Sequence, residues 1–232
     1  MTDSDLERFK QAAALAAVDS VKDGMVIGLG TGSTAKYLVM ALGEKVKQGL
    51  HIRGVCTSQE TASLAARYGI PLLDHEPRWT IDVAFDGADQ VDPSFNLIKG
   101  GGGALLKEKI VAASARQFVV LIDHSKQVPV LGGTFPLPIE VVPFGWGSTA
   151  RQIEGITHGR VVLRERDGAA FHTECGHVIL DVHLPSIDRP SELETALNHI
   201  PGVVETGLFI GRTDVLIVGT PHGTETHNVT RT

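Results

Sequence analysis

The chain has 232 residues, of which 42% are hydrophobic and 21% charged, and this composition is ordinary for a soluble globular protein. Its formal net charge of −6 argues against a nucleic-acid-binding surface, which needs clustered Lys and Arg. The first ten residues are polar and acidic, and no apolar run reaches the ~18 residues of a membrane helix, so we expect no signal peptide and no membrane partner. Cys56 and Cys175 lie far apart and form no CxxC pair, which predicts no disulfide framework and a cytoplasmic location.

Short apolar strands alternate with helical patterns in the first half of the chain. The strands are expected at residues 25–30, 52–56, 81–85 and 118–122, and the helices at 33–48, 60–68 and 104–115. Apolar strands separated by helices predict a parallel sheet that is covered on both faces. Ligands bind such sheets at the carboxyl ends of the strands, where most of the polar motifs of this chain lie.

The pattern changes after residue 130. A proline-rich stretch precedes elements in the order helix, strand, strand, helix and strand, which we expect at residues 148–154, 161–164, 177–183, 191–199 and 203–209. This order is typical of a small α+β (ferredoxin-like) domain of the split βαβ kind. Residues 214–219 read as a buried strand that returns to the first sheet, and the polar residues 224–232 read as a frayed tail. We therefore expect one domain at residues 1–130 plus 208–232 and a second at 131–207.

The first glycine motif, at residues 28–34, leads from a strand into a helix. Helix N-termini bind anions through unpaired N–H groups and the helix dipole, and Thr31, Ser33 and Thr34 would add hydroxyl donors. The motif is not a Walker A loop, and it matches a dinucleotide fingerprint only weakly. A single compact phosphate or sugar fits better, and a plain turn with Ser33 as the helix N-cap is the alternative.

Two carboxylates stand three residues apart in Asp86-Gly-Ala-Asp89, at the end of a predicted strand. Such a pair can accept hydrogen bonds from sugar hydroxyls or move protons. A bound metal ion is the rival interpretation, although no convincing set of further ligands accompanies the pair. A turn capped by an Asp side chain needs no ligand at all.

The run Lys99-Gly-Gly-Gly-Gly103 joins a strand to a helix, so we interpret it as a binding loop rather than a flexible linker. Its amides could form an anion-binding nest beside the Lys99 charge. Glu108 follows on the helix with mostly apolar neighbours, a pattern compatible with a general base, yet local sequence alone favours a solvated surface glutamate. Lys126, in Asp123-His-Ser-Lys126, follows the most apolar strand and could reach an anionic ligand.

Eight segments in this order resemble the ribose-5-phosphate isomerase type A family. They read GLGTGSTA, DGAD, IKGGGGALLKEKI, D-x-S-K, FPLPIEVVP, HVILDVH, IPGVVETGLF and GTPHG, and they extend from about Lys10 to about Gly223. The resemblance implies a Rossmann-like, mostly parallel α/β domain with a smaller α+β domain. It also implies an aldose-ketose isomerase of the pentose phosphate pathway, which interconverts D-ribose 5-phosphate and D-ribulose 5-phosphate through an enediolate. Such an enzyme would be cytoplasmic, use no metal or other cofactor, and form a homodimer or a dimer of dimers.

The resemblance also implies roles for single residues. Glu108 matches the proton-transferring base, Asp86 and Asp89 match carboxylates that hold the sugar and assist ring opening, and Lys99 completes the catalytic set. Lys10 matches a phosphate-contacting lysine. The remaining expected substrate-binding residues are Thr31, Gly32, Ser33, Thr34, Gly87, Ala88, Gly100, Gly101, Gly102 and Lys126.

Two other functions are compatible with the same fold. A sugar-phosphate sensor would bind without turnover, but the DNA-binding segment that normally accompanies such regulators is not visible here. A CoA-transferase-like enzyme would form a glutamyl thioester and show ping-pong kinetics. The sequence departs most from the family around residues 144–147 and 157–176, which leaves the catalytic set intact.

Overall fold

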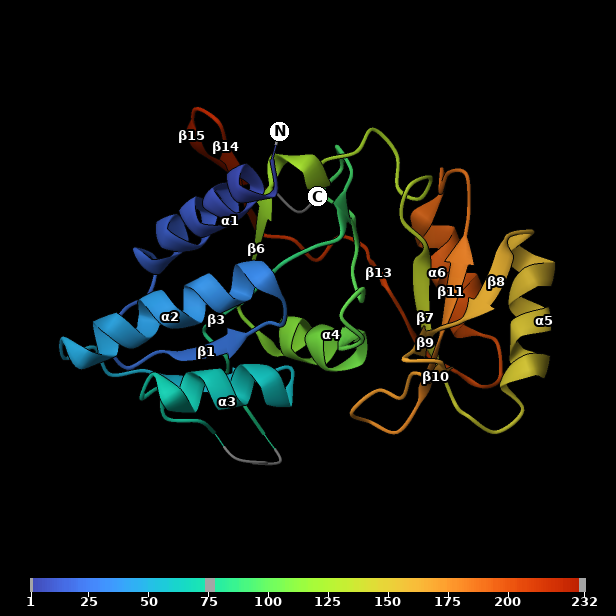
Figure 1. The fold of residues 1–232 in the computed structure, drawn as a ribbon, viewed down its shortest axis with the longest axis horizontal. Helices are drawn as coiled ribbons and strands as arrows, with labels where there is room; N and C mark the ends of the chain where they lie inside the picture. Colours follow the sequence, from blue (N-terminus) through green and yellow to red (C-terminus); the bar gives the residue numbers. More distant parts are fainter. Residues whose placement is uncertain (1, 74–77, 230–232) are drawn as a thin grey trace. The chain divides into compact units, whose positions relative to one another are not determined.

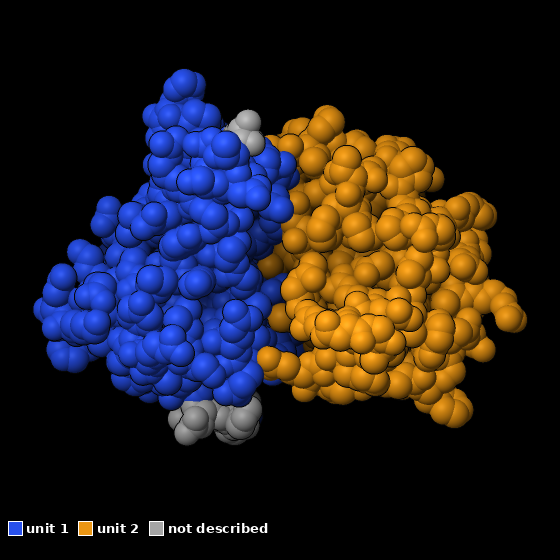
Figure 2. Space-filling view, viewed as in Figure 1, with its two compact units in different colours: residues 1–88, 107–126, 212–232 blue, residues 89–106, 127–211 orange. Residues whose placement is uncertain are grey.

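The computed structural model describes residues 2–73 and 78–229, and the chain divides into two compact units (Figure 2). The first unit comprises residues 1–88, 107–126 and 212–232, and the second comprises 89–106 and 127–211. These bounds differ from the sequence-based division in the placement of residues 89–106, 127–130 and 208–211, all of which lie in the second unit. The segment 89–106 carries β4 (Gln90–Val91) and β5 (Leu97–Ile98), which form an antiparallel sheet with β13 (Leu208–Phe209) of the second unit.

The first unit is built on a six-stranded sheet in the order β15-β14-β6-β3-β1-β2. Its strands are β1 (Val26–Leu29), β2 (Arg53–Cys56), β3 (Val83–Asp86), β6 (Phe118–Asp123), β14 (Val215–Thr220) and β15 (Gly223–Asn228). Every neighbouring pair is parallel except β14 and β15. The predicted parallel sheet and the return of residues 214–219 to it are therefore confirmed.

The prediction of a frayed tail at residues 224–232 is wrong up to Asn228, and residues 230–232 lie outside the described part of the chain. Gly223–Asn228 forms β15, which pairs with β14 along its whole length. An edge strand is held by its backbone hydrogen bonds, so polar side chains do not prevent it from forming.

Helices cover both faces of this sheet, as expected for apolar parallel strands. On one face Ile27 and Leu29 pack with residues of α1 (Asp3–Val18) and α2 (Ser33–Lys47), which lie side by side in Figure 1. The intervening Gly28 faces the other way, where Val111 of α4 (Leu105–Ser114) comes so close that a Cβ on Gly28 would lie 2.5 Å from its Cγ1. The remaining helix, α3 (Gln59–Arg67), lies beside α2 and contributes Ala65 to the same core as α1. Within the described residues, no helix is long and apolar enough to cross a membrane.

The second unit contains a four-stranded antiparallel sheet in the order β12-β7-β11-β8. Its elements are β7 (Leu137–Val141), α5 (Trp146–Thr157), β8 (Arg160–Leu163), β11 (Val178–His183), α6 (Pro190–Asn198) and β12 (Val203–Thr206). This is the predicted split βαβ arrangement, and a short hairpin of β9 (Glu165–Arg166) and β10 (Ala169–Ala170) is inserted between β8 and β11.

The two faces of the small sheet differ in character because side chains alternate along each strand. Leu180 and Val182 of β11 point to the apolar core that contains Ile153 of α5 and Leu197 of α6. Asp181 lies between them and therefore points to the opposite face. Glu140 of β7 lies between the core residues Ile139 and Val141, so it points to the same second face as Asp181.

Candidate active site

In the first unit, the ends of β1 and β3 are joined by the carboxylate of Asp86. Asp86 is the last residue of β3 and is 3% exposed. Its Oδ1 accepts hydrogen bonds from the backbone N–H of Thr31 at 3.2 Å and of Gly87 at 2.8 Å. A Cβ on Gly30 would lie 2.1 Å from this Oδ1, so only glycine at position 30 lets the carboxylate approach the loop. The structure thus brings Asp86 together with the first glycine motif.

The loop that Asp86 contacts leads directly into α2. Gly32 is the N-cap of this helix, with φ at +115°, a conformation that favours glycine. Ser33 is the first helical residue, so its alternative interpretation as the N-cap is wrong. Gly32 and Ser33 are exposed and Thr34 is buried. The amides of the first helical turn and the positive end of the helix dipole therefore lie at an exposed surface, where an anion can approach.

Three hydroxyl groups that the sequence analysis did not single out support this loop. The hydroxyl of Thr31 lies 2.7 Å from Thr57 Oγ1 and 2.8 Å from Ser58 Oγ. Thr61 Oγ1 donates a hydrogen bond to the carbonyl oxygen of Gly30 at 2.9 Å. Ser58 is the N-cap of α3, so the polar run between a predicted strand and a predicted helix was the available signal. These groups fix the loop between β1 and α2.

Glu108 is buried, with 4% of its surface exposed, so its interpretation as a solvated surface glutamate is wrong. It lies on α4, one helical turn before Val111, which packs against Gly28 of β1. Residues three apart share a helix face. The close approach of α4 to β1 at Gly28 therefore keeps this side of α4 away from water.

Lys126 ends the 3-10 helix η1 (His124–Lys126), which follows β6 directly. Buried Asp123, the last residue of β6, accepts a hydrogen bond from the Ser125 amide at 3.0 Å and thereby shapes this turn. The ring of His124 meets the ring of Phe9 edge-on, with 5.3 Å between centroids. This contact places α1, which carries Lys10, beside η1.

Lys10 takes part in a small polar cluster on α1. Its Nζ lies 2.7 Å from Glu7 Oε1, and Tyr37 donates its hydroxyl to Glu7 Oε2 at 2.7 Å. The hydrogen bonds from Lys10 and Tyr37 lower the pKa of Glu7. The carboxylate of Glu7 therefore stays ionised and holds the Lys10 ammonium at this position.

The second unit carries Asp89, Lys99 and the glycine run. Lys99 follows β5, is 3% exposed, and donates its backbone N–H to the carbonyl oxygen of Gly207 at 2.9 Å. Its Nζ lies 5.4 Å from the centre of the buried Phe209 ring. An ammonium over an aromatic face is attracted by the ring quadrupole, so Phe209 stabilises the position of this charge.

The glycine run is tied to Asp89. The Gly101 N–H donates a hydrogen bond to Asp89 Oδ2 at 2.8 Å. Gly100 and Gly103 have φ values of +104° and +88°, which favour glycine, whereas Gly101 and Gly102 are the exposed part of the loop. A Cβ on Gly101 would lie 2.8 Å from Asp89 Oδ1, so glycine is also needed for this close approach. The structure thus joins the second carboxylate of the DGAD motif to the loop of the KGGGG motif.

No described residues form a group of three or more His, Cys, Asp or Glu side chains that could hold a metal ion. Each of the two units carries groups that can move protons or bind an anion. The first supplies a buried carboxylate on α4, a second one at the end of β3, an exposed helix N-terminus, and lysines on η1 and α1. The second supplies a buried ammonium, a carboxylate and a loop of glycine amides. These groups suit proton transfer on an anionic substrate.

Comparisons with known proteins agree with this chemistry. The family model described as ribose 5-phosphate isomerase A (phosphoriboisomerase A) matches residues 53–223. A ribose-5-phosphate isomerase A from Gluconobacter oxydans is 47% identical over 97% of this chain and 98% of its own length. A D-ribose-5-phosphate isomerase solved in complex with phospho-erythronic acid is 42% identical, with a TM-score of 0.93 over 99% of this chain and 100% of that one. The ribose 5-phosphate isomerase A of Methanocaldococcus jannaschii is 43% identical, with a TM-score of 0.91 over 96% and 99% of the two chains.

Proposed function

Because this chain belongs to the ribose 5-phosphate isomerase A family, we propose that it interconverts D-ribose 5-phosphate and D-ribulose 5-phosphate by proton transfer through an enediolate. The observation that carries the mechanism is the burial of Glu108 on the helix that follows the glycine run. An aldose and its ketose differ by one proton moved between C2 and C1 and one moved between the two oxygens. A single carboxylate that is shielded from water can remove the carbon proton and return it.

Charge that develops on the substrate oxygens needs donors that are already in place. We assign this task to Lys99, whose ammonium is buried beside Phe209, and to the glycine loop. The Gly101 amide is engaged by Asp89, so we take the amide of the exposed residue Gly102 as the candidate donor of the loop. Asp86 and Asp89, with Gly87 and Ala88 between them, would bind the sugar hydroxyls and assist ring opening.

The phosphate group calls for a separate anion site. We place it at the N-terminus of α2, where Thr31, Gly32, Ser33 and Thr34 offer amides and hydroxyls. Lys126 and Lys10 would add positive charge. Binding at the phosphate orients the sugar without touching the reacting carbons. The phospho-erythronic acid bound by the solved relative is a phosphorylated sugar acid, which is consistent with a site for a sugar phosphate.

Neither alternative function is favoured. The relatives that match almost the whole chain are named as isomerases, not as sensors or CoA transferases. A sensor would bind ribose 5-phosphate without converting it, and a CoA transferase would require CoA. An assay of ribose 5-phosphate conversion without CoA therefore distinguishes both alternatives from an isomerase.

We also propose a location, a pathway and an oligomeric state for this enzyme. We place it in the cytoplasm, as the sparse cysteine usage suggests, and in the non-oxidative pentose phosphate pathway. We further propose a homodimer or a dimer of dimers, which light scattering on the purified protein would distinguish from a monomer.

The test is conversion of ribose 5-phosphate to ribulose 5-phosphate by the wild-type protein and by Glu108→Gln. Glu154→Gln is a matched control, because Glu154 is an exposed glutamate on α5. We expect the control to equal the wild type and Glu108→Gln to lose at least ~10²-fold in kcat while folding normally. No conversion by the wild type would refute the function, and near-normal turnover by Glu108→Gln would refute the assigned base.

A further inference from the structure

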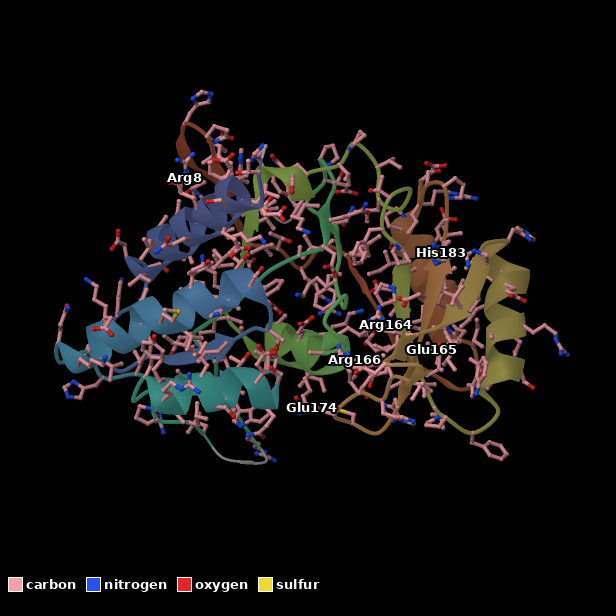
Figure 3. All side chains as sticks on the ribbon, in the orientation of Figure 1. Arg8, Arg164, Glu165, Arg166, Glu174 and His183 are labelled. Atoms are coloured by element: carbon pink, nitrogen blue, oxygen red, sulfur yellow. The ribbon has the colours of Figure 1, made fainter. Side chains whose placement is uncertain are left out.

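Arg164 lies at the centre of a hydrogen-bond network on the second face of the small sheet. It immediately follows β8, next to Glu165 and Arg166 in Figure 3. Its Nε donates to Asp181 Oδ2 at 2.8 Å and its Nη2 donates to Asp181 Oδ1 at 2.5 Å. The side chains of both residues are largely buried, with 14% and 16% of their surfaces exposed. This bidentate pair fixes the plane of the guanidinium group.

The third nitrogen of the guanidinium group contacts the glycine loop. Arg164 Nη1 donates to the carbonyl oxygen of Gly100 at 2.8 Å and to that of Gly101 at 3.1 Å. Both acceptors belong to the loop that begins at Lys99. An arginine whose other nitrogens are held by a carboxylate therefore ties the loop to the sheet beneath it.

The peptide group between Gly100 and Gly101 links Arg164 to Asp89. Its carbonyl oxygen accepts from Arg164, and its N–H donates to Asp89 Oδ2 at 2.8 Å. The carbonyl and the N–H of a trans peptide point in opposite directions, so Arg164 and Asp89 bind opposite edges of one rigid plane. A donor on the carbonyl also polarises the amide and strengthens the hydrogen bond that its N–H makes.

The hairpin that follows Arg164 supports the other end of the loop. Arg166 stacks on the ring of Phe171, with 4.5 Å between its guanidinium carbon and the ring centroid. A Cβ on Gly103 would lie 2.4 Å from Phe171 Cζ, so this ring packs closely against the last glycine of the run. The segment from Arg164 to Phe171 thus supports the loop at both ends.

We propose that Arg164, held by Asp181, is a positioning residue for isomerisation, which acts on the reaction by orienting Asp89 through the Gly100–Gly101 peptide group. The kinetic consequences of this inference rest on the proposed function, whereas the anchoring of the loop by Arg164 does not. Lysine cannot replace arginine here, because a single ammonium group cannot bind a carboxylate in a bidentate manner and donate to two carbonyls in the same plane.

The kinetic test compares Arg164→Ala and Arg164→Lys with Arg160→Ala, which removes an exposed arginine from the start of β8. We expect both Arg164 variants to lose ~10- to 100-fold in kcat/KM, since misplacing a reactive group by about 1 Å costs this much. The control should equal the wild type. Millimolar guanidinium ion, with sodium chloride as the salt control, should restore part of the activity of Arg164→Ala. Wild-type activity in Arg164→Ala would overturn the proposal.

A double-mutant cycle separates positioning of Asp89 from general support of the fold. If Arg164 acts through Asp89, Arg164→Ala should cost less than threefold in an Asp89→Asn background, because the group it positions is already changed. An equal loss in both backgrounds would show that Arg164 does not act through Asp89 and would overturn the proposal.

A third measurement does not depend on turnover. Amide hydrogen exchange of a fragment that covers residues 99–103 should be faster in Arg164→Ala than in the wild type and in Arg160→Ala, because the loop loses its anchor. Unchanged exchange would overturn the positioning role. If the wild type did not convert ribose 5-phosphate, the proposed function would fail, and this exchange measurement would still decide whether Arg164 holds the loop. Should Arg164→Ala not fold, Asp181→Asn provides the same comparison with a smaller change.

Discussion

Replacement of Gly30 by alanine would test whether the carboxylate of Asp86 is placed by the loop between β1 and α2. The added Cβ would lie 2.1 Å from Asp86 Oδ1 and 2.2 Å from Asp86 Cγ, so the carboxylate would have to move by about 1 Å. Gly30 does not have a positive φ, so alanine would cause no backbone strain of its own. The effect of the substitution therefore reports the collision alone.

The size of the effect follows from what the carboxylate loses. Overpacking costs about 1–3 kcal/mol, and each of the two amide hydrogen bonds to this buried carboxylate contributes about 1.5–3 kcal/mol. Asp86 and the loop can relax and so recover part of this loss. We therefore expect the free energy of unfolding to fall by about 2–4 kcal/mol. We also expect kcat/KM to fall by ~10²-fold, because the displacement of Asp86 is of the order of 1 Å.

Urea unfolding and steady-state kinetics would measure these two quantities. Gly155→Ala is the matched control, since a Cβ there meets nothing within 4 Å and alanine favours the helix α5 by up to ~1 kcal/mol. Its stability should be unchanged or slightly higher, with normal activity. If Gly30→Ala kept both wild-type stability and wild-type kcat/KM, the inferred contact between Gly30 and Asp86 would be wrong.

Two further predictions concern single side chains. Lys126→Ala should raise KM by ~10-fold with little change in kcat, because a charge contact made equally in the ground state and the transition state affects mainly binding. A fall in kcat at constant KM would instead place Lys126 at the reacting oxygens. Burial raises the pKa of the Cys56 thiol to about 12, so at pH 8 only ~10⁻⁴ of it is thiolate. Iodoacetamide should therefore leave Cys56 unmodified in the native protein and label it after unfolding in urea. Rapid labelling of the native protein, detected by mass spectrometry, would contradict the raised pKa of this thiol.

The features that the sequence predicted correctly are those that depend on local pattern. The apolar runs that end at Leu29, Asp86 and Asp123 gave the strands, and the glycine motifs that follow strands gave the turns at the carboxyl edge. The helix α1 was not predicted, because its buried residues are mostly alanines and its start is polar. The capping box between Thr2 and Asp5 was the signal that could have revealed it.

The burial of Glu108 and the role of Arg164 could not be predicted in this way. Glu108 is shielded because α4 packs against β1 at a glycine, and that contact joins residues far apart in the sequence. Arg164 is 64 residues from Gly100, whose carbonyl it holds, and it lies in the stretch where the chain departs from the family pattern. Contacts of this kind depend on tertiary structure, which residue periodicity does not encode.

The most direct test of the proposed mechanism is the reaction of ribose 5-phosphate in D₂O after exhaustive chelation, followed by NMR. A proton-transfer enzyme needs only a base and oxyanion donors, whereas a hydride-shift isomerase needs a metal to polarise both oxygens. We predict that turnover continues at the rate measured before chelation and that deuterium enters C1 of ribulose 5-phosphate only in part, because the burial of Glu108 slows but does not prevent exchange of its proton with solvent. Loss of turnover on chelation, with recovery when a divalent metal is added, would contradict the account and make Asp86 and Asp89 candidate metal ligands.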